Sequence, residues 1–218
     1  MSKSPLRIAV FASGSGTNLE AILQAIENGE LQDVSVTAVI SNKASAKALE
    51  RAASRGIATA VLNPGNFADE ATYVAALNEV FVGQDVNFVA LAGYLKKIPL
   101  SVVRQFQGRM LNIHPSLLPA FGGKGMYGAK IHQAALDRGV RWTGVTVHFV
   151  DEAYDTGPIM LQRTVPVYQT DTVESLAARV LAVEHQIFPE AFRLVAEGRV
   201  TVKDRKVTID PLIPKDTA

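Results

Sequence analysis

Short apolar runs rich in β-branched residues alternate with segments of helical period through the first half of the chain. The first run covers residues 6–12, and in the segment after it Leu19, Ile22, Leu23 and Ile26 recur at helical spacing. The runs are almost continuously apolar, which is typical of parallel strands that are covered on both faces. This alternation predicts an open, mostly parallel, doubly wound α/β sheet of the Rossmann-like kind with helices on both faces. Further strands are predicted at 34–41, 57–62, 87–93 and 109–113, and further helices near 45–55, near 69–82 and from Pro99.

The second half of the chain has a different pattern. Two apolar runs, 142–150 and 157–167, follow each other without a helix between them. They predict an antiparallel or mixed extension of the sheet. A long helix is expected at about 172–197, followed by a terminal hairpin or edge at 199–210. No linker, repeat or low-complexity stretch divides the chain, so a single domain over 1–218 is expected.

The composition excludes several classes of function. Cysteine is absent, which removes disulfides, thiol nucleophiles and metal sites with thiolate ligands. The formal net charge is +1, so no basic field indicates a nucleic-acid partner. No apolar stretch approaches the roughly 20 residues that a membrane span needs, and the N-terminal run is too short for a signal peptide. A cytoplasmic protein without a membrane partner is therefore expected.

A glycine-rich segment, ASGSGTNLE at residues 12–20, lies between the first predicted strand and the first predicted helix. Glycines there allow a tight turn and bring backbone amides close to an anion at the N-terminus of the helix. The structural alternative is a plain turn with Thr17 or Asn18 as the N-cap. A dinucleotide fingerprint would need a small residue in place of Leu19, and a P-loop would need Gly-Lys-Ser/Thr. The segment therefore favours a phosphate monoester, held by Gly16, Thr17 and Asn18.

One amide and one imidazole stand where the strand at 109–113 ends. Asn112 and His114 are two residues apart, so their side chains share a face of the strand. Open α/β sheets bind their ligands at the carboxyl ends of such strands, although a histidine there can also be purely structural. An amide can donate to a developing oxyanion, and a carboxylate from the downstream loop can keep an imidazole protonated. The candidate carboxylates are Asp151, Glu152 and Asp155.

Covalent and metal chemistry have no support in the sequence. No serine stands in a nucleophile elbow, and cysteine is absent. The histidines at 114, 132, 148 and 185 do not have the spacing of metal ligands. The residues alone therefore predict a group-transfer site that uses acid/base and oxyanion assistance on a phosphorylated substrate, without a metal.

Six motifs in the chain together resemble the phosphoribosylglycinamide formyltransferases, the folate-dependent enzymes of purine biosynthesis. The resemblance covers about residues 6–200, and the motifs are FASGSGTNLEAI, ISNK, LAGYLKKI, LNIHPSLLPAF, VHFVDEAYDTGPI and EHQIFP. It implies direct transfer of a formyl group from the co-substrate 10-formyltetrahydrofolate to the amine of glycinamide ribonucleotide. It also implies a nucleotide-phosphate half at about 1–100, a folate and catalytic half at about 101–200, and a C-terminal tail at about 200–218.

The resemblance also implies roles for individual residues. His114 would be the general acid, Asn112 would bind the formyl oxygen, and Asp155 would raise the pKa of the histidine. Gly16, Thr17 and Asn18 would hold the nucleotide phosphate, and Glu184 would hold the ribose side. The folate would lie against Asn112 and two segments. The first segment is made up of Leu95, Lys96, Lys97 and Ile98, and the second of Asp151, Glu152, Ala153, Tyr154 and Asp155.

Two segments depart from the family pattern. The segment 121–132, FGGKGMYGAKIH, is longer than the usual link to the following histidine, which leaves Lys124, Met126 and Tyr127 without a role. An arginine that reaches the folate tail in some members is missing from 67–73, where the sequence reads FADEATY. Lys96 or Lys97 is the alternative contact to that tail.

Three rival functions fit parts of the pattern. A 10-formyltetrahydrofolate hydrolase has a similar core but normally carries an extra N-terminal domain, for which a first strand at residue 6 leaves no room. A methionyl-tRNA formyltransferase needs a C-terminal RNA-binding domain, which the net charge of +1 also disfavours. A non-catalytic nucleotide-binding module would have no use for an Asn-x-His pair with a loop aspartate. A monomer and a homodimer are both compatible with the sequence.

Overall fold

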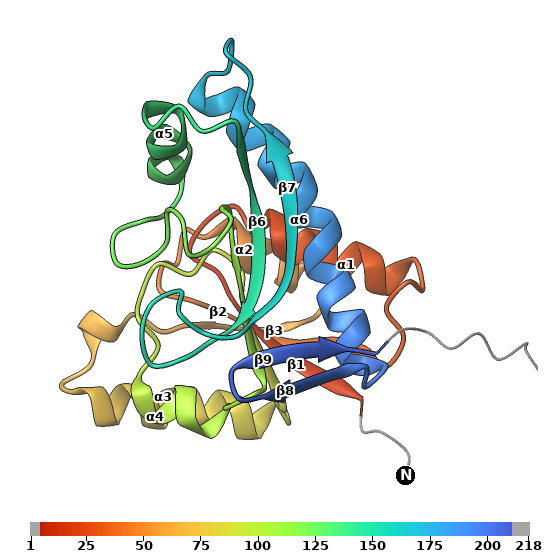
Figure 1. The fold of residues 1–218 in the computed structure, drawn as a ribbon. Helices are drawn as coiled ribbons and strands as arrows, with labels where there is room; N and C mark the ends of the chain where they lie inside the picture. Colours follow the sequence, from red (N-terminus) through yellow and green to blue (C-terminus); the bar gives the residue numbers. More distant parts are fainter. Residues whose placement is uncertain (1–4, 211–218) are drawn as a thin grey trace, which may run out of the picture.

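The computed structural model describes residues 5–210, and its centre is a seven-stranded sheet (Figure 1). The strand order is β3-β2-β1-β4-β5-β6-β7, and the first five strands in this order run parallel to one another. The predicted doubly wound α/β sheet is therefore confirmed. The strands are β1 (Leu6–Phe11), β2 (Val34–Ser41), β3 (Ala58–Val61), β4 (Phe88–Leu91), β5 (Met110–His114), β6 (Trp142–Phe149) and β7 (Ile159–Pro166).

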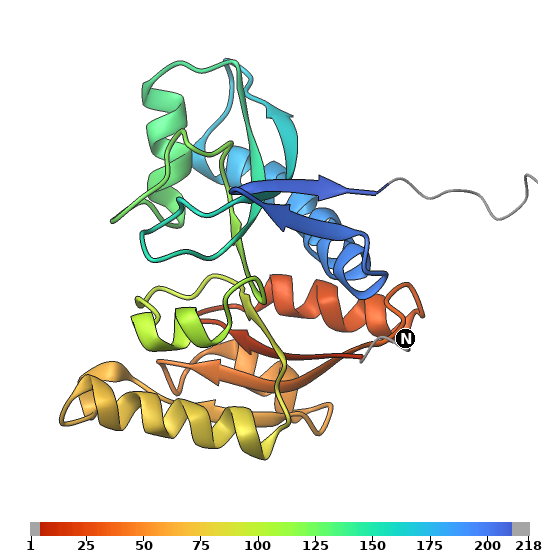
Figure 2. The ribbon, with the colours of Figure 1, turned by 60° about the horizontal axis from the view of Figure 1, so that its bottom comes forward.

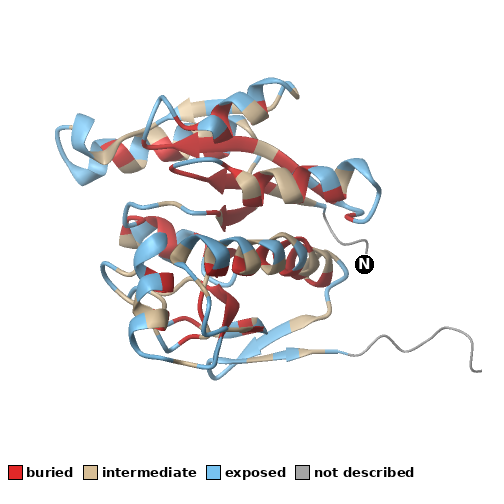
Figure 3. Ribbon diagram, turned by 90° about the horizontal axis from the view of Figure 1, so that it is seen from above, coloured by how far each residue is buried: buried red, intermediate tan, exposed pale blue. Residues whose placement is uncertain are grey.

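Helices cover both faces of the sheet, as the continuous apolar strands require (Figures 2 and 3). In β1, Ile8 and Val10 belong to the apolar cluster on one face, and Ala9 and Phe11 belong to the cluster on the other face. The first cluster includes α1 (Thr17–Glu27), α2 (Lys47–Ala53), α5 (Ala129–Asp137) and α6 (Val173–Ala196), and the second includes α3 (Glu70–Gly83) and α4 (Leu100–Gln105). A 3-10 turn, η1 (Pro64–Asn66), precedes α3.

The second half extends the sheet in antiparallel fashion, as its sequence pattern predicts. Strand β6 pairs antiparallel with both β5 and β7. Helix α6 begins at a capping box in which the Thr172 side chain accepts from the Ser175 amide. A hairpin, β8 (Val200–Lys203) and β9 (Lys206–Ile209), follows it, which confirms the predicted hairpin at 199–210. The rest of the expected C-terminal tail, residues 211–218, lies outside the described residues.

The strand order reverses direction at β1. From β1 the chain moves outward to β2 and β3, and it then returns to place β4 on the other side of β1. The loops that follow β1, β4 and β5 therefore meet at one edge, which is where sheets of this type bind ligands. None of the helices within residues 5–210 is both long and apolar enough to span a lipid bilayer.

Candidate active site

Four polar side chains meet where β5 ends. Asn112 and His114 share a face of β5, and the β5–β6 register places Asn112 opposite His148. The Asp155 carboxylate lies between the two imidazoles, with Oδ2 3.7 Å from His114 Nδ1 and Oδ1 3.7 Å from His148 Nε2. The Asn112 amide lies 3.0 Å from His148 Nε2 and 3.5 Å from Asp155 Oδ1. The fold therefore brings Asp155, from a distant part of the sequence, to Asn112 and His114.

The loop after β5 holds the histidine and the carboxylate from the other side. His114 Nε2 donates to the Phe121 carbonyl at 2.9 Å, and the Gly123 amide donates to Asp155 Oδ2 at 2.7 Å. With Nε2 protonated, a second proton on His114 has to go on Nδ1, the nitrogen that faces Asp155. The imidazolium formed in this way has its counter-charge in place.

Burial and charge act in opposite directions on His114. Burial lowers the pKa of His114, and the Asp155 carboxylate and the Phe121 carbonyl raise it by less. The contribution of Asp155 to the pKa of His114 is thus upward, but the net pKa lies below the ordinary value because the imidazole is only 4% exposed. Burial also raises the pKa of Asp155, but its contacts with His148, His114 and Gly123 outweigh burial, so the net pKa is lowered.

His148 is a component of the site that the sequence argument did not single out. Its Nδ1 lies 2.9 Å from the Phe149 carbonyl and donates to it, so Nε2 is free to accept from the Asn112 side chain. This contact fixes which end of the Asn112 amide faces β6. The sequence indicated this role only by a histidine inside a predicted strand. The strand register that places His148 opposite Asn112 cannot be seen in the sequence.

Replacing His148 by Phe should lower kcat about tenfold, because the Asn112 amide loses the acceptor that orients it. His148→Gln keeps a side-chain acceptor and should recover part of the loss. Steady-state rates and melting temperatures of both variants are the measurement. Equal rates for Phe and Gln at matched stability would show that His148 only fills space.

The glycine-rich loop turns the chain from β1 into α1. Gly16 is the N-cap of α1 at a φ of 68°, and no side chain caps the helix, so the alternative that Thr17 or Asn18 is the N-cap is wrong. A Cβ on Gly16 would lie 2.7 Å from Ala48 Cα, because α2 packs directly against the loop. Both the left-handed backbone and this close approach require glycine.

Asn18 and Glu184 come together beside this loop, from α1 and α6. Asn18 Nδ2 donates to Glu184 Oε2 at 2.6 Å, and both side chains are buried. Burial raises the pKa of Glu184, and the bond from Asn18 lowers it by less. Asn18 Oδ1 is buried and has no partner among the described residues. The structure thus brings together the four candidate nucleotide residues, Gly16, Thr17, Asn18 and Glu184.

Gly16→Val should weaken nucleotide binding at least tenfold and leave folate affinity nearly unchanged, because it distorts the loop and not the β5 cluster. Strain at positive φ should also lower the melting temperature by about 2–4 °C for each kcal/mol lost. Gly14→Ala is the matched control for stability, since a Cβ there has no atom within 4 Å. Both affinities and both melting temperatures are measured. If Gly16→Val lowers folate affinity as much as nucleotide affinity, the loop is only scaffold.

Apart from Asn112 and Asp155, the candidate folate residues fall into two groups. Leu95, Lys96, Lys97, Ala153 and Tyr154 are exposed, and Lys97 Nζ lies 6.0 Å from the centre of the Tyr154 ring. These residues can flank a flat aromatic group between the loops after β4 and β6. The others are engaged elsewhere: Ile98 is buried against α4, Asp151 pairs with Arg205, and Glu152 pairs with Arg104.

The first residues of the longer segment 121–132 contact the site directly. Phe121 and Gly123 bind His114 and Asp155, as described above. Lys124 and Tyr127 are exposed, Met126 is partly buried, and the Lys130 ammonium lies 4.8 Å from the centre of the Tyr127 ring. No group of three or more acidic or histidine side chains within residues 5–210 is arranged to hold a metal ion.

The chain is similar to known proteins in sequence and in fold. The sequence profile of the formyl transferase family matches residues 6–192. A chloroplastic phosphoribosylglycinamide formyltransferase from Vigna unguiculata is 44% identical over 194 residues, which cover 89% of this chain and 62% of the relative. The chain thus spans somewhat less than two thirds of the length of that relative.

Solved structures give the same result over a larger share of each chain. Glycinamide ribonucleotide transformylase 1 from Symbiobacterium toebii superposes with a TM-score of 0.89 at 44% identity, over 96% of both chains. A formyltetrahydrofolate deformylase from Pseudomonas syringae pv. tomato has a TM-score of 0.83 at 28% identity, over 95% of this chain and 66% of the other. The resemblance expected from the motifs is confirmed, and the chain belongs to the formyl transferase family.

Proposed function

We propose that this protein transfers a formyl group from 10-formyltetrahydrofolate to the amine of glycinamide ribonucleotide, a step of purine biosynthesis. The observation that carries the proposal is the meeting of Asn112, His114 and Asp155 at the end of β5. The names of the similar proteins from Vigna unguiculata and Symbiobacterium toebii support this choice of substrates.

The proposed reaction is a direct transfer between the two substrates. The amine nitrogen forms a bond to the formyl carbon, the bond from that carbon to the folate nitrogen breaks, and one proton passes from the amine to the folate nitrogen. Negative charge develops on the formyl oxygen as the amine adds. The Asn112 amide donates to this oxygen. His114, protonated on Nδ1 with Asp155 as its counter-charge, acts as the general acid: it gives a proton to the leaving folate nitrogen and regains the proton that the amine loses.

The buried position of His114 suits this role. Because burial lowers its pKa, His114 in the free protein favours the neutral form. The anionic oxygen of the reacting centre adds a second negative charge beside the imidazole and favours protonation at that stage. The protonated form of His114 is then stabilised most in the state in which the formyl oxygen carries negative charge, and that is when a general acid is needed.

The two substrates are assigned to opposite sides of the β5 cluster. The nucleotide phosphate is placed at the loop of Gly16, Thr17 and Asn18, with Glu184 on the ribose side. The folate ring system is placed between Leu95 and Tyr154, with the lysines at 96 and 97 near its acidic tail. Asp151 and Glu152 contribute to the walls of that side through their pairs with arginines.

A hydrolase that uses water as the acceptor is the second candidate, because a protein named formyltetrahydrofolate deformylase shares the fold at 28% identity. Such an enzyme has no need for a phosphate loop. A non-catalytic nucleotide-binding module is the third, and it would not consume the folate. The cytoplasmic location, the absence of a bound metal, and the choice between monomer and homodimer stay predictions.

The test is the rate at which 10-formyltetrahydrofolate is consumed with and without glycinamide ribonucleotide. We expect consumption to depend on the ribonucleotide and to be at background in water alone. Equal rates with and without it would identify a hydrolase, and no consumption in either case would favour a binding module. The dephosphorylated nucleoside is the control for the phosphate loop.

A further inference from the structure

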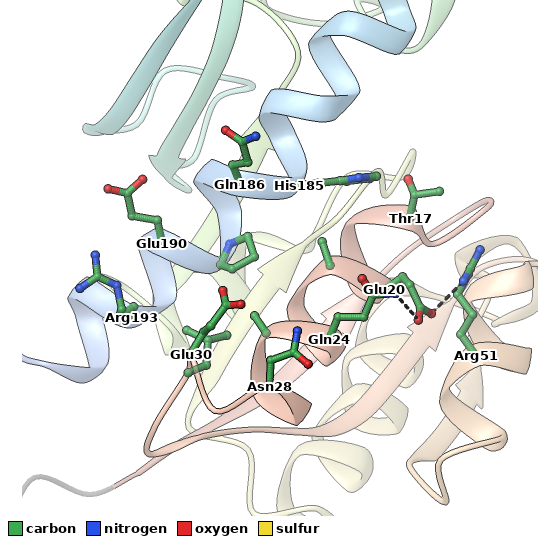
Figure 4. A pocket seen from close by; sticks show the side chains of 14 residues that line it. Thr17, Glu20, Gln24, Asn28, Glu30, Arg51, His185, Gln186, Glu190 and Arg193 are labelled. Atoms are coloured by element: carbon green, nitrogen blue, oxygen red, sulfur yellow. Dashed lines mark hydrogen bonds and ion pairs between the residues drawn. The ribbon is translucent and has the colours of Figure 1, made fainter.

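Arg51 joins α2 to the glycine-rich loop and to α1. Its Nε donates to the Ser15 carbonyl at 2.9 Å. Its Nη1 donates to Glu20 Oε2 at 2.8 Å (Figure 4). The guanidinium lies at one end of a groove of about 600 Å³ between α1 and α6, where Thr17 also lies.

Three consecutive carbonyls of the loop accept hydrogen bonds. The Gly14 carbonyl accepts from the Ala48 amide at 3.3 Å, and the Gly16 carbonyl accepts from the Glu20 amide at 2.9 Å. Between them, the Ser15 carbonyl accepts from Arg51. Of the three carbonyls, only that of Ser15 is held by a side chain.

These bonds also fix the direction of three amides. In a trans peptide the C=O and the following N–H point in opposite directions. Each of these three carbonyls therefore turns the amide that follows it away from the carbonyl's own hydrogen-bond donor. The amides oriented in this way are those of Ser15, Gly16 and Thr17. Within residues 5–210 none of these three amides donates to another group. Successive free amides of this kind at a helix N-terminus form a concave site for an anion.

We propose that Arg51 is a positioning residue for the nucleotide phosphate: it holds the Ser15 carbonyl so that the Gly16 amide faces the phosphate. This inference rests on the proposed function, because it takes the loop to be the phosphate site. Arg51 acts through the Ser15–Gly16 peptide and does not touch the reacting atoms. Its loss should therefore weaken nucleotide binding and leave the chemical step intact.

A second arginine separates this role from a simple charge effect. Arg55, one turn further along the chain beyond α2, also pairs with Glu20, with Nη2 2.7 Å from Oε1, and its Nε contacts Glu27. Both arginines thus neutralise the Glu20 carboxylate in the first turn of α1. Among the described residues, Arg55 makes no hydrogen bond to residues 12–16, the part of the glycine-rich segment that precedes α1. It is the matched control.

The experiment compares R51M, R51K and R55M in steady-state kinetics with glycinamide ribonucleotide and 10-formyltetrahydrofolate. R51M should raise the KM for the ribonucleotide about tenfold, with kcat and the KM for the folate within about twofold of the unchanged protein. R55M should stay within about twofold in all three constants. R51K keeps the charge but not the forked donor, so it should recover only part of the loss.

Three results would overturn the inference. Equal effects of R51M and R55M would mean that neutralising Glu20 is all that matters. Full recovery in R51K would mean that charge alone suffices. A loss of folate affinity equal to the loss of ribonucleotide affinity would mean that Arg51 only supports the fold, and the melting temperatures of the variants would show this independently.

A binding measurement separates this inference from the proposed function. Ribose 5-phosphate is titrated by calorimetry into the unchanged protein and into R51M. If the unchanged protein does not bind it, the phosphate assignment of the loop fails, and the inference fails with it. If both proteins bind it equally, only the inference about Arg51 fails. We expect binding to the unchanged protein and about tenfold weaker binding to R51M.

Discussion

Replacing His114 by Ala should lower kcat by about 10²–10⁴-fold, while the binding of both substrates changes far less. The general acid acts mainly in the transition state, so its removal leaves the ground-state contacts of the substrates in place. The imidazole is buried at the end of β5 and contacts Asp155 and the Phe121 carbonyl, which gives it one defined orientation. Single-turnover rates and equilibrium affinities are the measurements.

A second variant controls for loss of structure at this position. His114→Asn keeps a polar side chain that can still contact the Phe121 carbonyl, but it cannot take up a proton. It should fold like the unchanged protein and be as slow as His114→Ala. Turnover close to normal in either variant would mean that His114 is structural, and the proposed mechanism would then be wrong.

Replacing Asp155 by Asn should lower turnover about 10²-fold, because the imidazolium of His114 loses its counter-charge. The carboxylate contributes upward to the pKa of His114, against the lowering effect of burial. Its removal should therefore lower this pKa further. Since the protonated form is the active acid, activity is lost as pH rises through the pKa, and this alkaline limb of the pH–rate profile should move to lower pH.

Asp151→Asn is the matched control for this prediction. Asp151 lies on the same loop but pairs with Arg205, and it makes no contact with His114 among the described residues. Its substitution should leave the shape of the profile unchanged. If the Asp155→Asn profile keeps its height and shape, and the Asp151→Asn profile changes, the counter-charge has been assigned to the wrong carboxylate.

The fold follows from sequence patterns that are local. The near-continuous apolar strands and the helical spacing between them predict the parallel sheet. The absence of a helical segment between the apolar runs 142–150 and 157–167 predicts its antiparallel extension. The N-cap of α1 was missed because Gly16 takes a left-handed backbone that is supported by close packing on Ala48, a contact between distant segments. Such packing leaves no periodic signal in the sequence.

The candidate site could be predicted only in part for the same reason. Asn112 and His114 are visible because their spacing on one strand places them on one face. The choice of Asp155, the role of Glu184 and the folate contacts came from a family resemblance. Asp155 could not be chosen otherwise, since three carboxylates of one loop are equivalent in sequence alone. The contribution of His148 depends on strand register, and the net pKa of His114 depends on how deeply the fold buries it.

The central claim is that the formyl group passes directly to the amine of the ribonucleotide. Its most direct test is a single turnover with 10-formyltetrahydrofolate labelled with carbon-13 in the formyl group, in the presence of glycinamide ribonucleotide. The products are followed by NMR. We predict that the label appears as the formamide carbon of the ribonucleotide and that no labelled formate forms. Labelled formate, released at the same rate whether or not the ribonucleotide is present, would contradict the claim.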